Sequence, residues 1–202
     1  MQNRAQGEKR LLREIQAIEE DSRHNPDPDV TAQLVHGDLR HWIGRIKGPV
    51  GTPYEGGYYF LDIAIPEEYP YVPPKMKFDT RVWHPNVSSQ TGAICLDILK
   101  NEWSPALTIR TALLSVEALL AAPEPDDPQD AEVANLCKNH PEQHAAKARQ
   151  WRDTYAADKN WPYEAKVKNL VDMGIPADRA RAALQKQNWD VNAAANECFG
   201  DM

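Results

Sequence analysis

The chain has 202 residues, of which 42% are hydrophobic, and a net charge of -7 from 23 basic and 30 acidic side chains. This composition predicts a soluble globular protein with room for one medium domain and a small second one. We find no basic patch interleaved with aromatic residues, so no nucleic-acid partner is expected. No apolar run approaches 18 residues and residues 1–7 lack an apolar core, so neither a membrane partner nor a secretory signal is expected.

The chain has three cysteines, Cys95, Cys137 and Cys198, which are widely spaced and form no CxxC pair. An odd number at this spacing argues against a disulfide framework and against a zinc site. A reducing compartment is therefore expected, with the cytoplasm as the location and the nucleus as the alternative. Cys137 and Cys198 lie on helical patterns with apolar neighbours and are interpreted as structural.

The first elements predict a helix followed by an antiparallel meander. Leu11, Leu12, Ile15 and Ile18 recur at helical spacing and predict a helix over residues 8–21. A proline-containing segment at 25–29 breaks it. Strand-like runs then follow at residues 30–35, 39–46, 58–65 and 75–79. Apolar residues alternate along the third run, as in a sheet with one buried face, and no βαβ alternation is present.

The second half of the chain is predicted to be largely helical after a long irregular stretch. Residues 80–107 are expected to be irregular but ordered, because they carry several large apolar side chains. Helical patterns return at 108–120, 131–139 and 142–156, and three short ones follow a boundary near residue 160. We therefore predict a first domain at 5–156, a linker at 157–161 and a second domain at 162–201.

The segment around Cys95 combines a thiol with an upstream amide. Cys95 lies in an apolar run, nine residues after Asn86, which follows His84 and Pro85. A thiol can act as a nucleophile, and an amide can donate to a developing oxyanion. An asparagine in a proline-fixed turn equally often bonds local backbone, so both roles are open for Asn86. His84 is interpreted as setting this turn, with a general base as the alternative.

Residues 8–156 resemble the catalytic domain of ubiquitin-conjugating enzymes. Six motifs carry the resemblance in order: residues 48–49 with 54–57, 69–75, 84–86, 92–99, 103–105 and 125–128. Residues 162–200 are similar to a three-helix ubiquitin-associated (UBA) domain. The pairing resembles class II enzymes that extend ubiquitin chains. It implies an α+β fold, a four-stranded antiparallel meander flanked by helices, followed by a three-helix bundle.

The resemblance implies roles for the residues around the thiol. Cys95 would receive ubiquitin as a thioester from the activating enzyme, which consumes ATP upstream, so no bound cofactor is expected. Asp127 matches an acidic residue at the mouth of the site. Its carboxylate can position a lysine amine and help to take its proton. The alternative is an acidic helix-end turn, which is preferred for Asp126 and Asp130.

The resemblance also implies three binding surfaces. RING-type ligases would dock on Tyr71 and on the loop of Ser104, Pro105 and Ala106. The activating enzyme would contact Lys9, Arg10 and Arg13, with ligases as competitors for that surface, and the alternative is a solvated helix face. In the UBA-like region, Met173, Gly174 and Ile175 would offer an apolar patch to ubiquitin. Glu197 stands where the family often has leucine, which is expected to weaken that binding. Intramolecular docking on the catalytic domain and a weak tether that raises local ubiquitin concentration are both open roles for this region.

Three rival functions are weighed against ubiquitin transfer. A cysteine hydrolase would need a histidine beside Cys95, and His84 is the obvious local candidate. A non-catalytic ubiquitin adapter would be expected to lack Cys95. An enzyme for a ubiquitin-like modifier is disfavoured by residues 88–92, which look more like ubiquitin enzymes. The class resemblance further implies chains that direct protein substrates to degradation.

Overall fold

The computed structural model describes residues 2–187 and 190–200. The chain divides between Lys159 and Asn160 into two compact units. The division falls within the segment 157–161 that the sequence analysis assigns to a linker, and the predicted end of the second domain at residue 201 lies outside the described residues. Within the described part of the chain, no helix has both the length and the apolar character needed to cross a bilayer.

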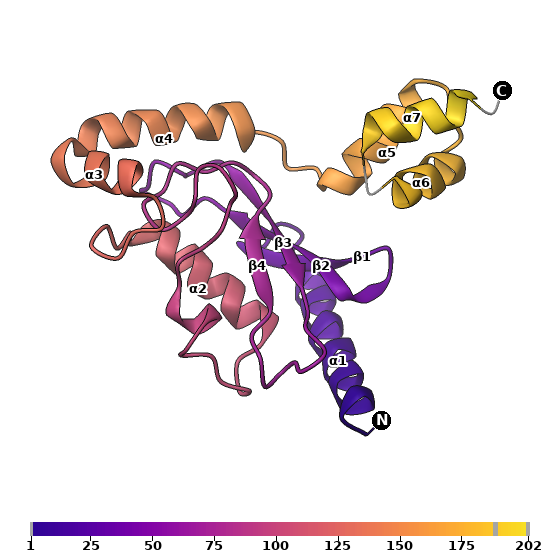
Figure 1. Ribbon diagram of the computed structural model, residues 1–202, viewed down its shortest axis with the longest axis horizontal. Helices are drawn as coiled ribbons and strands as arrows, with labels where there is room; N and C mark the ends of the chain where they lie inside the picture. Colours follow the sequence, from indigo (N-terminus) through magenta and orange to yellow (C-terminus); the bar gives the residue numbers. More distant parts are fainter. Residues whose placement is uncertain (1, 188–189, 201–202) are drawn as a thin grey trace. The chain divides into compact units, whose positions relative to one another are not determined.

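The first unit contains one long helix, a sheet and then three further helices (Figure 1). Their bounds are α1 Gln2–His24, β1 Val30–Val35, β2 Asp38–Lys47, β3 Tyr58–Ala64, β4 Lys75–Phe78, the 3₁₀ turn η1 Asp97–Leu99, α2 Ile109–Ala121, α3 Ala131–Asn139 and α4 Pro141–Tyr155. All neighbouring strands pair antiparallel in the order β1-β2-β3-β4. The predicted α+β meander is therefore confirmed.

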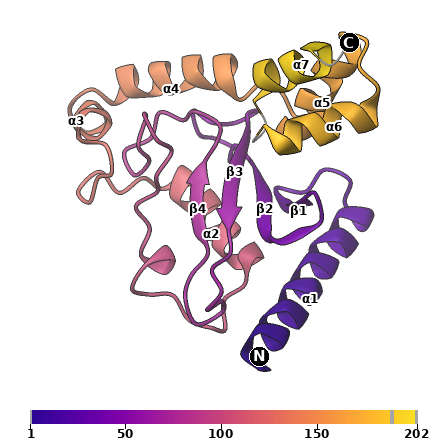
Figure 2. The same cartoon turned by 45° about the vertical axis from the view of Figure 1, so that its right-hand side comes forward.

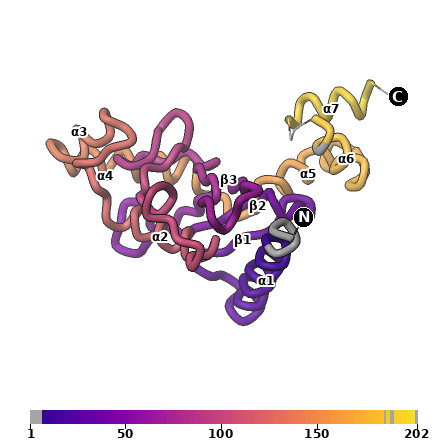
Figure 3. The backbone as a smooth tube through the Cα atoms, turned by 60° about the horizontal axis from the view of Figure 1, so that its bottom comes forward, coloured from indigo at the N-terminus to yellow at the C-terminus, as the bar shows by residue number. Residues whose placement is uncertain are grey.

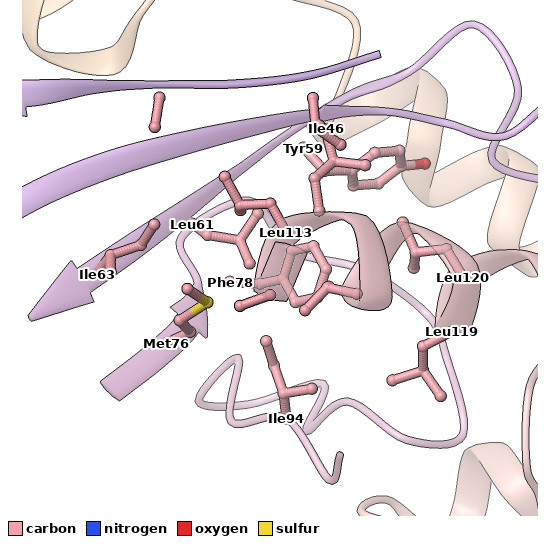
Figure 4. Close-up of a cluster of buried hydrophobic side chains, with 14 of the residues drawn as sticks. Ile46, Tyr59, Leu61, Ile63, Met76, Phe78, Ile94, Leu113, Leu119 and Leu120 are labelled. Carbon is pink, nitrogen blue, oxygen red and sulfur yellow. The ribbon is translucent and has the colours of Figure 1, made fainter. Parts of the chain in front are cut away.

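Strand alternation places one face of the sheet against α2. Gly44 pairs with Leu61, which pairs in turn with Phe78, so these positions share the inner face. Leu113 of α2 packs on this face and is fully buried (Figure 4). A Cβ at Gly44 would lie 2.7 Å from a Leu113 methyl carbon, so any larger residue would force the Leu113 side chain to shift and the close packing of α2 favours glycine there. Burying each large side chain of this kind contributes about 1.5–3 kcal/mol.

Helix α1 is longer than predicted. Leu11, Ile15 and Ile18 form its buried face, and the helix lies beside β1 (Figure 2). Leu12, the fourth residue of the predicted stripe, is 44% exposed, because adjacent residues of a helix do not share a face. The helix begins at Gln2 rather than at residue 8, because its first turns precede the apolar stripe and gave no periodic signal.

The segment between β4 and α2 is a succession of loops, apart from η1 (Figure 3). Isolated antiparallel bridges join Val87 to Ile94 and Lys77 to Ala93, so the loops are tied to each other and to the sheet edge. The segment ends at Thr108, whose side chain accepts a hydrogen bond from the Thr111 amide in a capping box that opens α2. The predicted irregular but ordered segment thus has a backbone framework of its own.

The second unit is a three-helix bundle, as predicted. Its helices are α5 Pro162–Asp172, α6 Ala177–Lys186 and α7 Val191–Gly200. Val167, Leu170 and Leu184 lie in its core, and Cys198 is buried among them. Gly174 follows α5 with φ of +91°, a conformation that favours glycine and turns the chain toward α6.

Candidate active site

Cys95 is held by its neighbours on the chain rather than by a regular element. Ile94 is buried in the core, reaching it from a loop below the sheet (Figure 4). The Cys95 amide donates to the Asn86 carbonyl at 2.9 Å. The Gly92 carbonyl accepts from the Phe78 amide, and φ of +75° at Gly92 allows this close approach. Side chains alternate along extended chain, so the buried Ile94 leaves the thiol of Cys95 partly exposed.

Two charged groups of opposite sign lie beside the thiol. Asp127 Oδ2 is 3.6 Å from Cys95 Sγ and accepts from it. Lys100 Nζ is 3.3 Å from the same sulfur and donates to it. Asp127 is exposed, so an incoming amine can reach both its carboxylate and the sulfur. The structure thus brings together Cys95 and Asp127, two of the predicted catalytic residues.

Asn86 is 1% exposed and its amide is fully engaged. Its Nδ2 donates to the Glu124 and Asp127 carbonyls, both at 2.8 Å, and its Oδ1 accepts from the Glu124 amide at 2.8 Å. An amide nitrogen carries two donor hydrogens. In this geometry Asn86 has no donor left for an oxyanion, so of the two roles considered, the structure supports bonding to backbone. These bonds hold the loop that bears Asp127.

His84 is buried and supports the same turn. Its Nε2 donates to the Leu119 carbonyl at 2.9 Å, while its Nδ1 accepts from the Asn86 amide at 3.1 Å. Burial lowers the pKa of His84 to about 3, so the ring is neutral in this arrangement. Because both ring nitrogens are engaged, His84 is not placed to act as a general base on the thiol.

The loop that carries Asp127 is pinned at its far end as well. The Pro85 carbonyl accepts from the Gln129 and Asp130 amides. The Asp130 side chain caps α3 and also accepts from the Ser89 hydroxyl at 2.6 Å and the Ser89 amide at 3.1 Å. Together with Asn86, these bonds fix both ends of the loop at 124–130.

The predicted ligase surface is exposed. Tyr71 is 72% exposed, and Ser104, Pro105 and Ala106 are exposed as well. Trp103 donates its indole N–H to the Pro70 carbonyl at 2.7 Å, which joins the two loops directly.

Among the basic residues of α1, Lys9 and Arg13 are exposed, but Arg10 is not free. Arg10 donates to the Glu14 carboxylate and to the Pro105 and Leu107 carbonyls. The prediction that Arg10 contacts the activating enzyme is therefore corrected: its guanidinium is committed within the domain. Helical spacing alone could not separate it from its exposed neighbours.

In the second unit, Met173 is 50% exposed and Ile175 only 5% exposed. The expectation that Ile175 offers an apolar surface is wrong, because its side chain packs in the core of the bundle. Glu197 accepts from Lys186 and Gln187 at 2.8 and 2.5 Å, and these bonds lower its pKa. Other exposed apolar side chains of this unit are Val171 and Phe199.

Lys100 is the residue of the site that the sequence analysis missed. It follows Cys95 by five residues, across η1, which turns the chain back toward the thiol. A lysine five residues from a cysteine carries no signal until that turn is known. Within the described residues, no group of three or more His, Cys, Asp or Glu side chains is placed to hold a metal ion.

Comparison with known proteins agrees with this geometry. A family model described as ubiquitin-conjugating enzyme matches residues 10–152, and a UBA-domain model described for the tyrosine-protein kinase TNK1/sid3 matches residues 163–198. The chain is 50% identical to human ubiquitin-conjugating enzyme E2 K over 188 residues, 92% of each chain. It is 48% identical to Arabidopsis thaliana ubiquitin-conjugating enzyme E2 27 over 185 residues, 92% of this chain and 94% of the relative.

Solved structures give the same result. A ubiquitin-conjugating enzyme E2 domain of Toxoplasma gondii matches with a TM-score of 0.68 and 58% identity, covering 73% of this chain and 97% of that one. A putative ubiquitin-conjugating enzyme of Plasmodium yoelii matches with a TM-score of 0.69 and 55% identity, covering 74% and 94%. The fold is that of ubiquitin-conjugating enzymes, which are transferases that work through a cysteine thioester. The chain belongs to the ubiquitin-conjugating enzyme family, whose general partners are ubiquitin, its activating enzyme and ubiquitin ligases.

Proposed function

We propose that Cys95 is the residue that carries ubiquitin. Its thiolate attacks the thioester carbonyl carbon presented by the activating enzyme; a new carbon–sulfur bond forms and the cysteine of the activating enzyme leaves as a thiolate. The donor is already activated at the expense of ATP, so this chain requires no bound cofactor or metal. The partly exposed thiol on a braced loop supports this role.

Asp127 then assists transfer to a lysine, and its position 3.6 Å from Cys95 Sγ is the observation that carries the proposal. A lysine amine has a reference pKa of about 10.4 and must lose a proton before it attacks. The amine attacks the thioester carbonyl, the carbon–nitrogen bond forms and Cys95 leaves as a thiolate. The proton passes to the Asp127 carboxylate and from there to solvent.

The surfaces of the molecule suggest how partners are held. RING-type ligases dock on Tyr71 and on residues 104–106, and the activating enzyme contacts Lys9 and Arg13. The second unit binds ubiquitin weakly through Met173 and raises its local concentration for chain building. We place this activity in the cytoplasm, with the nucleus as a second location, and expect the chains to direct protein substrates to degradation.

A charging assay tests the proposal. Activating enzyme, ATP and ubiquitin are incubated with the wild type, with Cys95→Ala and with the matched control Cys137→Ala, and the products are run on non-reducing gels. A thiol-sensitive adduct on the wild type and the control alone supports Cys95 as the carrier. No adduct on the wild type would refute ubiquitin transfer and favour a related modifier or an adapter. Random lysine use in the chains, measured by mass spectrometry, would refute the degradative role.

A further inference from the structure

The carboxylate of Glu14 joins three segments that are far apart in the sequence. Glu14 lies on α1, and its side chain is 9% exposed. Its Oε1 accepts from Arg10 Nε at 2.8 Å and from the Tyr69 hydroxyl at 2.7 Å. Its Oε2 accepts from the backbone amide of Ile109, the first residue of α2, at 2.9 Å. One carboxylate therefore ties α1 both to the loop of Tyr69 and to the start of α2.

Arg10 extends this junction to the loop before α2. Its two terminal nitrogens donate to the Pro105 and Leu107 carbonyls, each at 2.5 Å, and its guanidinium lies 5.4 Å from the centre of the Tyr69 ring. Bonds from a guanidinium are stronger and more directional than those between neutral groups. Arg10 and Glu14 thus hold the loop at 104–107 against the same helix that holds the Tyr69 loop.

The two loops also touch each other over this support. The indole N–H of Trp103 donates to the Pro70 carbonyl, and the Trp103 and Tyr69 rings lie 5.9 Å apart. Burial raises the pKa of Tyr69, so its hydroxyl stays protonated and donates to Glu14. The support lies largely inside the domain, whereas Tyr71 and residues 104–106 are exposed above it.

A partner that contacts two loops binds best when the loops already have the bound spacing. Loops that must be ordered on binding reduce affinity, because their lost freedom opposes association. Here the exposed side chains can contact the partner, while the spacing between them depends on residues below. Changing the support would therefore weaken docking while leaving the docking side chains unaltered.

We propose that Glu14 and Arg10 are positioning residues for ligase docking, which fix the relative position of the Tyr71 loop and the 104–106 loop. The inference rests on the proposed function, in which these two loops are the ligase surface. It gives Arg10 a role distinct from that of Lys9 and Arg13 on the same helix. This supporting role belongs to the inner face of α1, whereas Lys9 and Arg13 are exposed on the same helix.

The test uses two single variants of the full chain, Glu14→Gln and Arg10→Lys. Glu19→Gln is the matched control, because Glu19 is an exposed carboxylate on the same helix. Glutamine keeps the shape of Glu14 but loses its charge and one acceptor; lysine keeps the charge of Arg10 but not its fork. Charging by the activating enzyme, discharge to free lysine, and discharge stimulated by a titrated RING domain are measured. The RING domain comes from a panel screened on the wild type.

For both variants we expect charging and unstimulated discharge within about twofold of wild type. The half-saturating RING concentration should rise about tenfold, because contact loops that must be ordered on binding reduce affinity by about this factor. The Glu19→Gln control should match the wild type. In ¹⁵N spectra, the Trp103 indole and Tyr71 amide signals should move in both variants but not in the control. The proposal requires both results in each variant: the shifted Trp103 and Tyr71 signals and the raised half-saturating RING concentration.

An unchanged half-saturating RING concentration with normal charging would overturn the inference while leaving the proposed function intact. An equal fall in charging, unstimulated discharge and stimulated discharge would also overturn it, because that pattern reports a general loss of structure. If no RING domain of the panel stimulated the charged wild type, ligase docking on these loops would itself be refuted. Failure of the wild type to charge would instead refute the proposed function.

Discussion

Asn86 offers the sharpest test of how the site works, because its two candidate roles predict different kinetics. The perturbation is Asn86→Ala, made alone and together with Asp127→Ala. Asn86 makes three side-chain hydrogen bonds of 2.8 Å to the loop at 124–127. At about 0.5–1.5 kcal/mol each, they hold that loop with roughly 3 kcal/mol in total.

That energy sets the expected rate. Because bonds at Pro85 and Asp130 also hold this loop, losing roughly 3 kcal/mol from Asn86 reduces the time that Asp127 spends beside Cys95 by up to about 10²-fold, since 1.4 kcal/mol is a factor of ten. Losing a general base costs about 10²–10⁴-fold, so Asp127→Ala should slow transfer at least as much. If Asn86 acts by positioning Asp127, the double variant should be no slower than the slower single variant. If Asn86 donates to an oxyanion independently, the two losses should multiply to about 10⁴-fold or more.

The assay is single-turnover discharge of preformed Cys95 thioester to free lysine, after charging of each variant has been verified. Asn135→Ala serves as a control, because Asn135 is an exposed asparagine on α3 whose side-chain oxygen accepts from Asn139, away from the loop at 124–127. Equal rates for the double variant and the slower single variant would support positioning. Multiplied losses in the double variant would refute the reasoning and return Asn86 to direct catalysis.

Three further outcomes are expected. The pKa of His84 is about 3 in the folded state against 6.5 when unfolded, so the unfolded state binds more protons between these values. The free energy of unfolding should therefore rise with pH from 4.5 to 6.5 by up to about 1.4 kcal/mol per pH unit. Urea titrations at several pH values should show a weaker pH dependence of that free energy for His84→Gln. The Lys100 amine lies beside Cys95 Sγ, so charged enzyme left without an acceptor should transfer ubiquitin to Lys100 and form a thiol-resistant adduct. Lys100→Arg should lack this adduct, and equal amounts of it on reducing gels of the wild type and the variant would contradict the prediction. Gly48→Ala should lower the free energy of unfolding by about 3 kcal/mol or more in denaturant titrations, because its Cβ would clash with the Tyr54 carbonyl; a loss below about 1 kcal/mol would count against the packing argument.

The sheet and the thiol loop could be read from the sequence because their signals are local. Alternation along residues 58–65 indicated the buried face, and the apolar run around Cys95 indicated a buried segment that carries a thiol. Asp127 was found only through the family resemblance, since nothing in the composition of an acidic turn distinguishes it from Asp126. Its distance from the sulfur needed the fold.

What the sequence could not supply are contacts between distant segments. Arg10 meets carbonyls 95 and 97 residues further along the chain, so no local pattern separates it from Arg13. Ile175 follows a glycine with positive φ that turns its side chain into the bundle, whereas Met173 before it stays exposed. For Arg10 and Ile175 the residue type was read correctly, but the contacts of the side chain within the fold were not. Those contacts depend on packing, which sequence spacing does not encode.

The arrangement around Cys95 also explains why transfer fits better than hydrolysis. A cysteine hydrolase needs a base that activates water, and the local candidate, His84, is buried with both ring nitrogens engaged by backbone. A transferase whose acceptor is a lysine amine needs less, because the acceptor brings its own nucleophile once a proton is removed. Asp127 is exposed beside the sulfur and can accept that proton, while Asn86 holds it there by bonds to the backbone. In the proposed mechanism, the site therefore presents a Cys95 thioester and one carboxylate to an arriving amine, and the proposed ligase and ubiquitin surfaces select the amine.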